Sequence, residues 1–373
     1  MTDPMESLLV TPLNALHRSL GARLVAFAGY DMPVQFAEGI LAEHLHTRAK
    51  ASLFDVSHMG QIRLTGPETA AALESLVPAD IIGLPAGRQR YTFLTNDAGG
   101  ILDDLMVANA GDAIMLVVNA ARKHDDLAWL RFRIGSRCRI EPMFDRALLA
   151  LQGPAAARVM AECAPEFASM HFMQYAQGRI DGIECSISRS GYTGEDGFEI
   201  GVSAENAERL AKRLLADRDV APAGLGARDS LRLEAGLCLH GHDIDDATTP
   251  VEASLEWAIQ KVRRRGGDRA GEFPGAKIIL HQLEHGTIRR RVGLIPDGRA
   301  PIREGESLFD ADRRVVGRVT SGGFGATVNG PVAMGLVDSG VAAIGTTLTA
   351  IVRERPRACR VVSLPFVPHR YHR

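Results

Sequence analysis

The sequence predicts an α+β protein: two related α+β modules, followed by an all-β unit that forms a small antiparallel barrel or sandwich. Three observations support this fold class. One strand–turn–helix pattern occurs twice in the first half of the chain, residues 261–272 are loop-like and charged, and short alternating runs fill the chain beyond Arg290. Strands at regular spacing, separated by turn signals, are typical of small barrels and sandwiches.

The repeated pattern is a strand, a Gly-Pro turn, and a helix that ends at a proline. Ile62–Pro67 leads into Glu68–Pro78, and Leu149–Pro154 leads into Ala155–Pro165. Glycine permits the sharp exit from the strand and proline favours the start of a helix. The match indicates two related modules. Coincidence remains the alternative, because Gly-Pro starts many helices.

The elements before and after the repeat follow from local signals. Thr11-Pro12 predicts a helix start, 24–28 a strand, and 37–50 a helix. A domain boundary is expected between about 260 and 290, from the composition shift. The strands expected beyond it are Val292–Ile295, Ser307–Phe309, Val315–Thr320, Val332–Leu336, Thr347–Val352 and Arg360–Leu364.

Composition excludes several classes of protein. The 373 residues carry 43 Lys+Arg against 45 Asp+Glu, a net charge of −2, whereas general nucleic-acid binders are strongly basic. Because long uncharged apolar runs are missing, we expect no membrane span. Met1–Ser7 has the features of neither a signal nor a transit peptide. The five scattered cysteines, without a CxxC pair, favour a reducing cytoplasm.

Familiar catalytic motifs are missing, and three unusual stretches remain. The P-loop, Rossmann, HExxH and GxSxG patterns do not occur. Cys238–Asp243 has metal-ligand residue types but no zinc spacing, so no metal is expected. In Gly99–Val107, strand alternation sends Asp103 and Asp104 to opposite faces, so one can face a pocket. A solvated turn after Gly-Gly is the alternative.

The other two unusual stretches also combine charge with glycine. Within Ser190–Ile200, three glycines and two acids in Gly191–Gly197 describe a loop whose backbone approaches something closely, with Glu199 on the outgoing strand. Glu199 facing solvent is the alternative. In Gly224–Gly236, helical spacing aligns Arg228 with Arg232, which on its own indicates an ion-paired helix start.

Together these stretches resemble the aminomethyltransferase (T protein) family of the glycine cleavage system over nearly the whole chain. The segments that carry the resemblance are Val25–Gln35, Ser52–Met59, Thr95–Leu105, Gly191–Glu199, Ala227–Gly236, Asp243–Glu252, Phe273–Lys277 and Pro365–Tyr371. The loop Gly323–Asn329 departs from the family's usual Ser-Pro-Thr-Leu, which puts its local contacts in doubt.

The resemblance implies a fold and a reaction. It implies a folate-binding portion over 8–265, with a second module near 55–145 inserted, and a C-terminal β-barrel over 285–370. The three bodies would form a ring around a central pocket. Tetrahydrofolate would attack the aminomethyl carbon carried on the lipoyl arm of the H protein, giving 5,10-methylenetetrahydrofolate and ammonia. Folate is an acceptor substrate, also in its polyglutamylated form, and neither a metal nor a nucleophilic side chain is required.

The resemblance also assigns roles to single residues. Asp104 becomes the catalytic acid, with Asp103 a weaker claimant, and Glu199 the carboxylate that binds the pterin. Arg228 holds the substrate and Tyr371 closes the site from the tail. The remaining candidates for the pocket wall are Tyr192, Asn119 and Trp257, with ordinary packing as the alternative for the two aromatic residues.

Two rival functions and one surface remain open. The first alternative is a folate-dependent demethylase of a methylamine, ether or sulfonium substrate, which would have the same fold. The second is a folate-binding accessory protein without transferase activity. Such a protein would have no need for Asp104, so the presence of Asp104 speaks against it. The basic runs Lys261–Arg265 and Arg289–Arg291 are expected near the mouth of the pocket. Either they attract an acidic carrier protein or the polyglutamate tail, or they are solvated loops.

Overall fold

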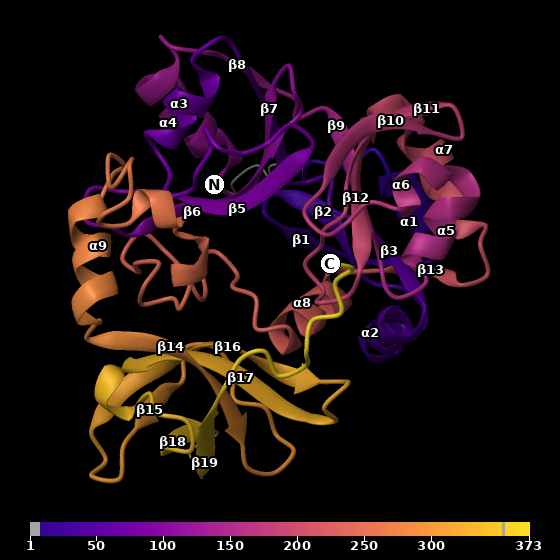
Figure 1. Cartoon of the computed structure of the whole chain (residues 1–373). Coiled ribbons are helices and arrows are strands. Elements are labelled where there is room, and N and C mark those ends of the chain that lie inside the picture. The colour runs from indigo at the N-terminus through magenta and orange to yellow at the C-terminus, as the bar shows by residue number, and fades with distance from the viewer. Residues whose placement is uncertain (1–7, 353–354) are drawn as a thin grey trace, which may run out of the picture.

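The computed structural model describes residues 8–352 and 355–373, so the expectation for Met1–Ser7 falls outside the described residues. Figure 1 shows three bodies grouped around a shared centre: two α+β modules and a β-barrel. This architecture confirms the predicted fold class. The barrel is closed, which rules out the alternative of a sandwich.

The larger module is built on a six-stranded sheet with the order β10-β11-β12-β9-β3-β13. Its strands are β3 (Ala51–Asp55), β9 (Arg146–Gln152), β10 (Tyr175–Ile180), β11 (Ile183–Ser188), β12 (Gly197–Ser203) and β13 (Val220–Ala223). A two-stranded sheet of β1 (Arg23–Phe27) and β2 (Tyr30–Gln35) accompanies it. Its helices are α1 (Asn14–Ser19), α2 (Gly39–Ala49), α5 (Ala156–Cys163), α6 (Pro165–Ala168), α7 (Ala204–Leu215) and α8 (Leu225–Glu234).

The smaller module is built on a five-stranded sheet with the order β5-β6-β7-β4-β8. Its elements are β4 (Gly60–Thr65), α3 (Thr69–Glu74), β5 (Arg88–Thr95), β6 (Ile101–Asn109), β7 (Ile114–Val118), α4 (Lys123–Ile134) and β8 (Arg139–Pro142). The strands on either side of it in the chain, β3 and β9, pair with one another, with Ser52 opposite Gln152. The smaller module is therefore an insertion between two neighbouring strands of the larger sheet.

The two modules share one topology. The order β5-β6-β7-β4-β8 repeats β10-β11-β12-β9-β13, with β3 added between β9 and β13. Strand β4 of the smaller module and strand β9 of the larger module each lead into a Gly-Pro turn, where Gly66 has a φ of 131° and Gly153 a φ of 132°. A side chain rarely adopts this backbone conformation, and a Cβ at Gly153 would lie 2.2 Å from the Lys50 carbonyl oxygen. The repeat predicted from the sequence is therefore structural and not coincidental.

The barrel closes in the order β14-β17-β16-β15-β18-β19. Its strands are β14 (Arg289–Pro296), β15 (Ser307–Phe309), β16 (Val315–Gly325), β17 (Gly330–Asp338), β18 (Thr347–Val352) and β19 (Arg355–Val362), with a short 3₁₀ turn at Ser339–Val341. The last strand begins before the predicted Arg360 and ends before Leu364. From there the C-terminal tail leaves the barrel and crosses to the larger module, as Figure 1 shows in yellow.

The connection between α8 and the barrel packs against the smaller module. It contains 3₁₀ turns at Glu256–Ala258 and Lys261–Arg263, and α9 (Ala276–His285). Its Val251, Leu255 and Phe273 are buried in one cluster with Phe93 and Ile101 of the smaller module. This packing fixes the connection beside the β5–β6 hairpin.

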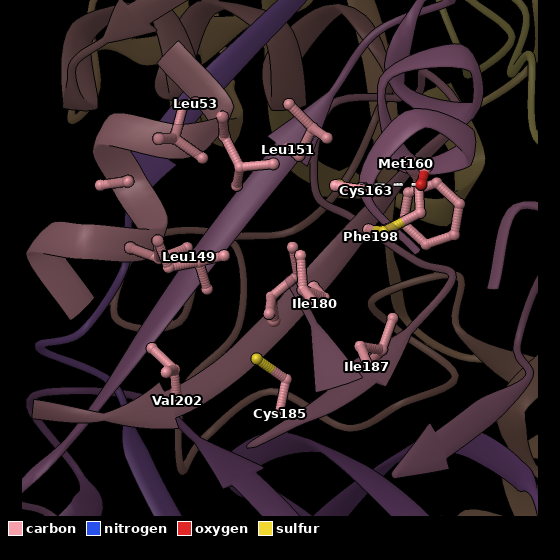
Figure 2. Packing of buried hydrophobic residues seen from close by; sticks show 14 of the residues in the cluster. Leu53, Leu149, Leu151, Met160, Cys163, Ile180, Cys185, Ile187, Phe198 and Val202 are labelled. Atoms are coloured by element: carbon pink, nitrogen blue, oxygen red, sulfur yellow. Dashed lines mark hydrogen bonds between the residues drawn. The ribbon is translucent and has the colours of Figure 1, made fainter. Parts of the chain in front are cut away.

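The core of the larger module lies between its sheet and its helices. Figure 2 shows Leu149, Leu151 and Phe198 of the sheet packed with Met160 of α5. Leu149 and Leu151 share one face because side chains alternate along a strand. The five cysteines are free and buried, as expected for small apolar residues. Within the described residues, we find no helix that combines the length and apolar character needed to span a membrane.

The predicted N-terminal cap is wrong in detail. Helix α1 begins at Asn14, after Leu13, so Thr11 and Pro12 lie in the turn before it. The Thr11 hydroxyl donates to Asp55 Oδ2 at 2.6 Å instead of capping the helix. A buried carboxylate at the end of β3 is the stronger acceptor, because charge-assisted hydrogen bonds exceed neutral ones.

Candidate active site

Asp104 lies on β6 and is held by two neighbours. The Tyr91 hydroxyl donates to Asp104 Oδ2 at 3.0 Å, and Asn119 Nδ2 donates to Asp104 Oδ1 at 2.7 Å. Burial, followed by the charge of Asp103, raises the pKa of Asp104 to about 7. A carboxylate with a pKa near the working pH can hold or release a proton, which suits acid–base work.

Asp103 lies on the opposite side of the strand, as the alternation predicted. It is fully buried, whereas Asp104 is half-buried. The Asn119 backbone N–H and side-chain Nδ2 both donate to the Asp103 carboxylate, at 3.0 and 2.8 Å. Both acids belong to β6, so the alternative of a solvated turn is wrong. Asp103 is therefore enclosed in the core of the smaller module, and Asp104 is the acid that remains partly accessible.

Glu199 lies on β12, after the glycine-rich loop. It lines a partly open cavity of about 30 Å³ between the sheets of the two modules. The Ser190 hydroxyl donates to Glu199 Oε2 at 3.1 Å. Polar residues from both modules share this cavity: Gln61, Gln89, Tyr175, Ser186 and Ser188. The solvent-facing alternative is therefore wrong, and the acid faces the interior between the modules.

Arg228 lies on α8 and has a side-chain nitrogen available for a ligand. Its guanidinium carbon stands 4.7 Å from the centre of the Tyr192 ring. Among the described residues, nothing accepts a hydrogen bond from its buried Nη1. Burial lowers the pKa of Arg228, and the charge of Glu199 opposes this shift. A buried cationic donor without an acceptor is costly, and an anionic or carbonyl oxygen of a ligand would satisfy it.

The other arginine of this stretch has a structural role. Arg232 Nη1 contacts Asp243 Oδ2 at 2.8 Å, and the Thr320 and Ser321 hydroxyls of the barrel donate to the same carboxylate. Asp243, which the sequence analysis considered as a metal ligand, therefore joins α8 to the barrel. Of the described residues, no group of three or more His, Cys, Asp and Glu is arranged to hold a metal ion.

Tyr371 reaches the site on the C-terminal tail. Its ring stacks on Phe172 with the ring centres 4.1 Å apart. The neighbouring Arg370 donates from Nε to Glu195 Oε1 at 3.0 Å, which attaches the tail to the glycine-rich loop. Burial raises the pKa of Tyr371 to about 12, and the charges of Glu195 and Glu199 add to the shift. The tail thus brings Tyr371 close to Glu199.

Tyr192 and Trp257 line the wall in different ways. Tyr192 is half-buried, and its hydroxyl donates to the Cys238 carbonyl. Burial raises the pKa of Tyr192 far above its usual range, and the charges acting on it include those of Asp104 and Arg228. Trp257 is 61% exposed and stacks on Tyr91 with ring centres 5.4 Å apart. The alternative of ordinary core packing is therefore wrong for Trp257.

Sequence reasoning missed Tyr91, which both holds Asp104 and stacks on Trp257. Phe93 pairs with Asp104 across β5 and β6, which places Tyr91 diagonally opposite Asp104 on the same face. Diagonal neighbours lie within reach of an aromatic side chain. The proximity of Tyr91 to Asp104 can be inferred only once the register of this hairpin is known.

The prediction of two exposed basic runs is wrong for one arginine in each run. Arg263 is 1% exposed, and its Nη1 contacts Glu74 Oε1 at 3.2 Å. Arg291 is also buried, and its Nη1 donates to the Gly236 carbonyl. Lys261 is exposed and lines an open cleft of about 470 Å³ that also contains Trp257. Buried arginines pair with the carboxylates and carbonyls they meet, so the sequence run overstates the surface charge.

The altered barrel loop keeps its contacts with the larger module. The Thr327 backbone N–H donates to Glu234 Oε1 at 2.7 Å, and its hydroxyl lies 2.9 Å from His44 Nε2. Glu234 is fully buried at the end of α8, so the loop supplies a donor that this carboxylate requires. The altered loop therefore takes part in the junction between the barrel and the larger module.

Comparisons with known proteins agree with this architecture. Residues 13–263 match the family described as "GCVT N-terminal domain", and residues 289–368 match "Glycine cleavage T-protein C-terminal barrel domain". A solved structure, the glycine cleavage system aminomethyltransferase T from Bartonella henselae, is 47% identical, with a TM-score of 0.93. The match covers 98% of this chain and 100% of that one.

Curated relatives extend the comparison to distant organisms. The chicken (Gallus gallus) protein named "Aminomethyltransferase, mitochondrial" is 45% identical, covering 100% of this chain and 96% of its own. The human protein of the same name is 44% identical, covering 98% and 92%. The Dictyostelium discoideum protein is 42% identical, covering 97% and 93%.

The duplicated α+β portion with its closing barrel has the architecture of a solved T-protein structure, and the curated relatives are named aminomethyltransferases, so the chain is a transferase enzyme. More particularly, the chain belongs to the glycine cleavage T-protein family and is an aminomethyltransferase of the glycine cleavage system. This confirms the main prediction over the demethylase and accessory-protein alternatives.

Proposed function

We propose that this chain transfers the methylene carbon of an aminomethyl group from the dihydrolipoyl arm of the H protein to tetrahydrofolate. Two C–N bonds to folate form, while the C–S bond to the arm and the C–N bond to the leaving amine break. The two protons lost by the folate nitrogens leave with ammonia and the released thiol. The single observation that carries the proposal is the placement of Asp104, which Tyr91 and Asn119 hold by both carboxylate oxygens and whose charge acts on Tyr192 of the larger module.

Asp104 acts next to the reacting nitrogens. In its ionised form it stabilises the cationic, iminium-like carbon that develops as ammonia departs. In its protonated form it carries a proton between the folate nitrogens and the leaving groups. Asn119 and Tyr91 hold both of its carboxylate oxygens, so the acid is oriented before substrate binds.

The larger module and the tail bind the folate. Glu199 accepts two adjacent N–H groups from the pterin edge, a bidentate arrangement that carboxylates favour. Arg228 offers its unpartnered Nη1 to a carbonyl or carboxylate oxygen of the same ligand. Tyr371 closes the pocket from the tail, while Tyr192 and Trp257 supply flat walls for the rings.

The partners follow from the same reaction. We propose the lipoylated H protein as donor and tetrahydrofolate, including its polyglutamylated form, as acceptor. No metal takes part in the proposed steps, because the folate amine is the nucleophile and Asp104 provides the charge. The net charge of −2 offers no basis for nucleic-acid binding, and neither nucleic acid nor membrane is among the proposed partners.

The cytoplasm is the proposed location. Five free, buried cysteines fit a reducing compartment. The relatives compared above are named mitochondrial. Fractionation of cells that produce the full-length chain tests the proposal, and recovery in an organelle fraction would contradict it.

The decisive experiment supplies purified protein with aminomethyl-loaded H protein and tetrahydrofolate. We expect ammonia and methylenetetrahydrofolate to appear in equal amounts. If ammonia appears without a folate product, the protein breaks down the aminomethyl group on the H protein but does not transfer its carbon to folate. Failure to form either product would refute the proposed function.

A further inference from the structure

Gln152 is a fully buried polar residue that none of the proposed steps uses. It is the last residue of β9, directly before the Gly-Pro turn of the larger module. Its side chain lies against the glycine-rich loop, which connects β11 to β12 over residues 189–196. A buried amide is normally hydrogen-bonded, so the partners of Gln152 indicate what the residue holds in place.

Both polar atoms of the Gln152 side chain contact this loop. Nε2 donates to the Ser190 carbonyl at 2.9 Å, and the Thr193 hydroxyl donates to Oε1 at 2.8 Å. A carbonyl oxygen can only accept, so the amide nitrogen must face Ser190 and the amide oxygen must face Thr193. The Thr193 oxygen accepts in turn from the Glu195 backbone N–H at 3.2 Å. The amide therefore fixes the path of the loop between Ser190 and Thr193.

Two of the three glycines in this stretch leave room for Gln152. A Cβ at Gly191 would lie 1.8 Å from Gln152 Oε1, and one at Gly197 would lie 2.6 Å from Gln152 Nε2. Real Cβ contacts are essentially never shorter than 3.0 Å, so a side chain at either position would displace the amide. The sequence predicted a loop whose backbone approaches something closely, and that partner is the side chain of Gln152.

Ser190, whose carbonyl Gln152 holds, also contacts Glu199. Its hydroxyl donates to Glu199 Oε2 at 3.1 Å and lies 2.9 Å from the Ser188 hydroxyl. A hydroxyl has one proton, so Ser190 donates to Glu199 and accepts from Ser188. Ser190 is buried, so little solvent competes for this hydrogen bond. A shift of the Ser190 backbone would therefore change the contact that orients the Glu199 carboxylate.

The repeat supplies an internal comparison. Before its Gly-Pro turn, the smaller module has Thr65 where the larger module has Gln152. The corresponding connection, between β6 and β7, is the short turn at residues 110–113, which is closed by a hydrogen bond from the Ala110 N–H to the Ala113 carbonyl at 2.9 Å. Such a turn needs no side chain to support it. The long amide thus occurs in the module that has the long loop.

We propose that Gln152 is a positioning residue of the folate site: it holds the glycine-rich loop so that the Ser190 hydroxyl donates to Glu199, which orients this carboxylate for the pterin. This inference rests on the proposed function, because it assigns a purpose to the orientation of Glu199 in folate binding. Gln152 acts through Ser190 and takes no part in the chemical step. Its loss should therefore weaken folate binding and leave kcat nearly unchanged.

Gln152→Met in the full-length protein tests the proposal. Methionine keeps the unbranched shape of the side chain and removes both hydrogen bonds to the loop. We expect the Kd for tetrahydrofolate, measured by calorimetry without the H protein, to rise about tenfold, on the scale of one lost hydrogen bond. KM for folate should rise in parallel, with kcat within about threefold of wild type. An unchanged Kd would overturn the proposal.

Thr193→Val is a second, milder variant. Valine keeps the shape of threonine and removes the hydroxyl that donates to Gln152 Oε1. The Kd for tetrahydrofolate should rise about threefold, because the hydrogen bond to the Ser190 carbonyl remains. If Thr193→Val folds and binds folate as the wild type does, the proposal is refuted even where Gln152→Met fails to fold.

A double-mutant cycle tests whether Gln152 acts through Ser190. Ser190→Ala removes the hydroxyl that donates to Glu199 and should also raise the Kd about tenfold. If both residues act on the same contact, the variant that combines Gln152→Met with Ser190→Ala should bind folate about as weakly as either single variant. Independent effects would multiply to about 100-fold and would contradict the proposal.

Two controls separate positioning from stability. Thr65→Val changes the equivalent position in the smaller module and should leave the Kd for folate unchanged. Leu210→Ala opens a cavity in the core of the larger module, at a fully buried residue of α7, and lowers stability without removing a contact of the loop. Melting temperatures are measured for every variant. If Leu210→Ala raises the Kd as much as Gln152→Met at an equal loss of melting temperature, Gln152 is only structural and the proposal fails.

Amide hydrogen exchange separates this inference from the proposed function, because it requires neither the H protein nor a product. The backbone amides of residues 190–196 should exchange faster in Gln152→Met than in the wild type and in Thr65→Val. If they exchange as in the wild type, Gln152 does not hold the loop and the proposal is overturned, even in an active enzyme. If they exchange faster and the Kd rises while the wild type forms no product, the role of Gln152 is supported and the proposed reaction fails.

Discussion

The two modules share one topology and treat their functional carboxylates in opposite ways. In the smaller module, Asp104 lies on β6, the second strand after the Gly-Pro helix, in front of a second buried acid. In the larger module, Glu199 lies on β12, the third such strand, and its charge acts on the buried guanidinium of Arg228. One acid lies beside a like charge, and the other acts on a buried cation.

This difference divides the work of the enzyme. Like charge and burial raise a carboxyl pKa toward neutrality, which suits proton transfer and charge stabilisation. A carboxylate beside an arginine stays available as an acceptor for N–H groups of a ligand. We therefore expect changes in the smaller module to affect kcat, and changes in the larger module to affect the KM for folate.

The largest effect is expected for Asp104→Asn. The shape is kept, but the charge beside the developing cation is lost, which costs on the order of 10²–10³ in kcat. Stability should not fall. Since the fold raises the pKa of Asp104, the ionised form is disfavoured in the folded state above about pH 7, so the melting temperature at higher pH should be equal or higher. Asp103→Asn, the matched variant, should reduce kcat less, and the reverse order would place the wrong acid in the pocket.

The second prediction concerns pH. If the ionised form of Asp104 stabilises the transition state, kcat rises with pH and levels off above about 7, since the raised pKa leaves the acid protonated below that value. Below about pH 7, kcat should fall about tenfold for each unit by which the pH decreases. Steady-state rates from saturating substrates provide the test. A kcat that falls as pH rises through the same range would identify the proton on Asp104 as the active form.

The third prediction concerns the larger module. Glu199→Gln replaces one of two acceptor oxygens by a donor, and a hydrogen bond involving a charged group contributes about 1.5–3 kcal/mol. KM for tetrahydrofolate should rise about 10- to 100-fold, with a smaller change in kcat. The fall of kcat below about pH 7 should be the same as in the wild type. If kcat drops as in Asp104→Asn while KM stays constant, the division of labour between the modules is wrong.

The fourth prediction concerns the tail, which joins the larger module to the barrel. Arg370→Ala removes the contacts to Glu195 and to the Arg48 carbonyl, so Tyr371 is held less firmly. Arg370 is half exposed, so we expect only about a three- to tenfold rise in KM for folate. Arg360→Ala, an exposed residue of β19 in the same barrel, is the control. Equal effects of the two variants would mean that the tail does not complete the site.

The fold and the two acids could be predicted from the sequence because the patterns that indicate them are local. The Gly-Pro turns at Gly66 and Gly153 and the alternation of Asp103 with Asp104 depend on neighbours within a few residues. The contacts of Tyr91 and Arg263 depend on distant partners. Tyr91 contacts Asp104 because of the strand register, and Arg263 of the connection contacts Glu74 of α3 in the smaller module. Such long-range pairs leave no trace in the spacing of a single sequence.

The smallest effect is expected at the cleft beside Trp257. Since Arg263 is buried against Glu74, reversing its charge would test folding and not binding. Lys261 is exposed and lines the cleft, so Lys261→Glu tests attraction of an acidic carrier. At low salt, KM for the H protein should rise about two- to threefold with kcat unchanged. The difference should vanish at high salt, because screening removes it. Lys277→Glu, a change at an exposed residue of α9, is the control. Equal responses of the two variants would mean that the rise in KM comes from the net charge of the protein and not from the cleft.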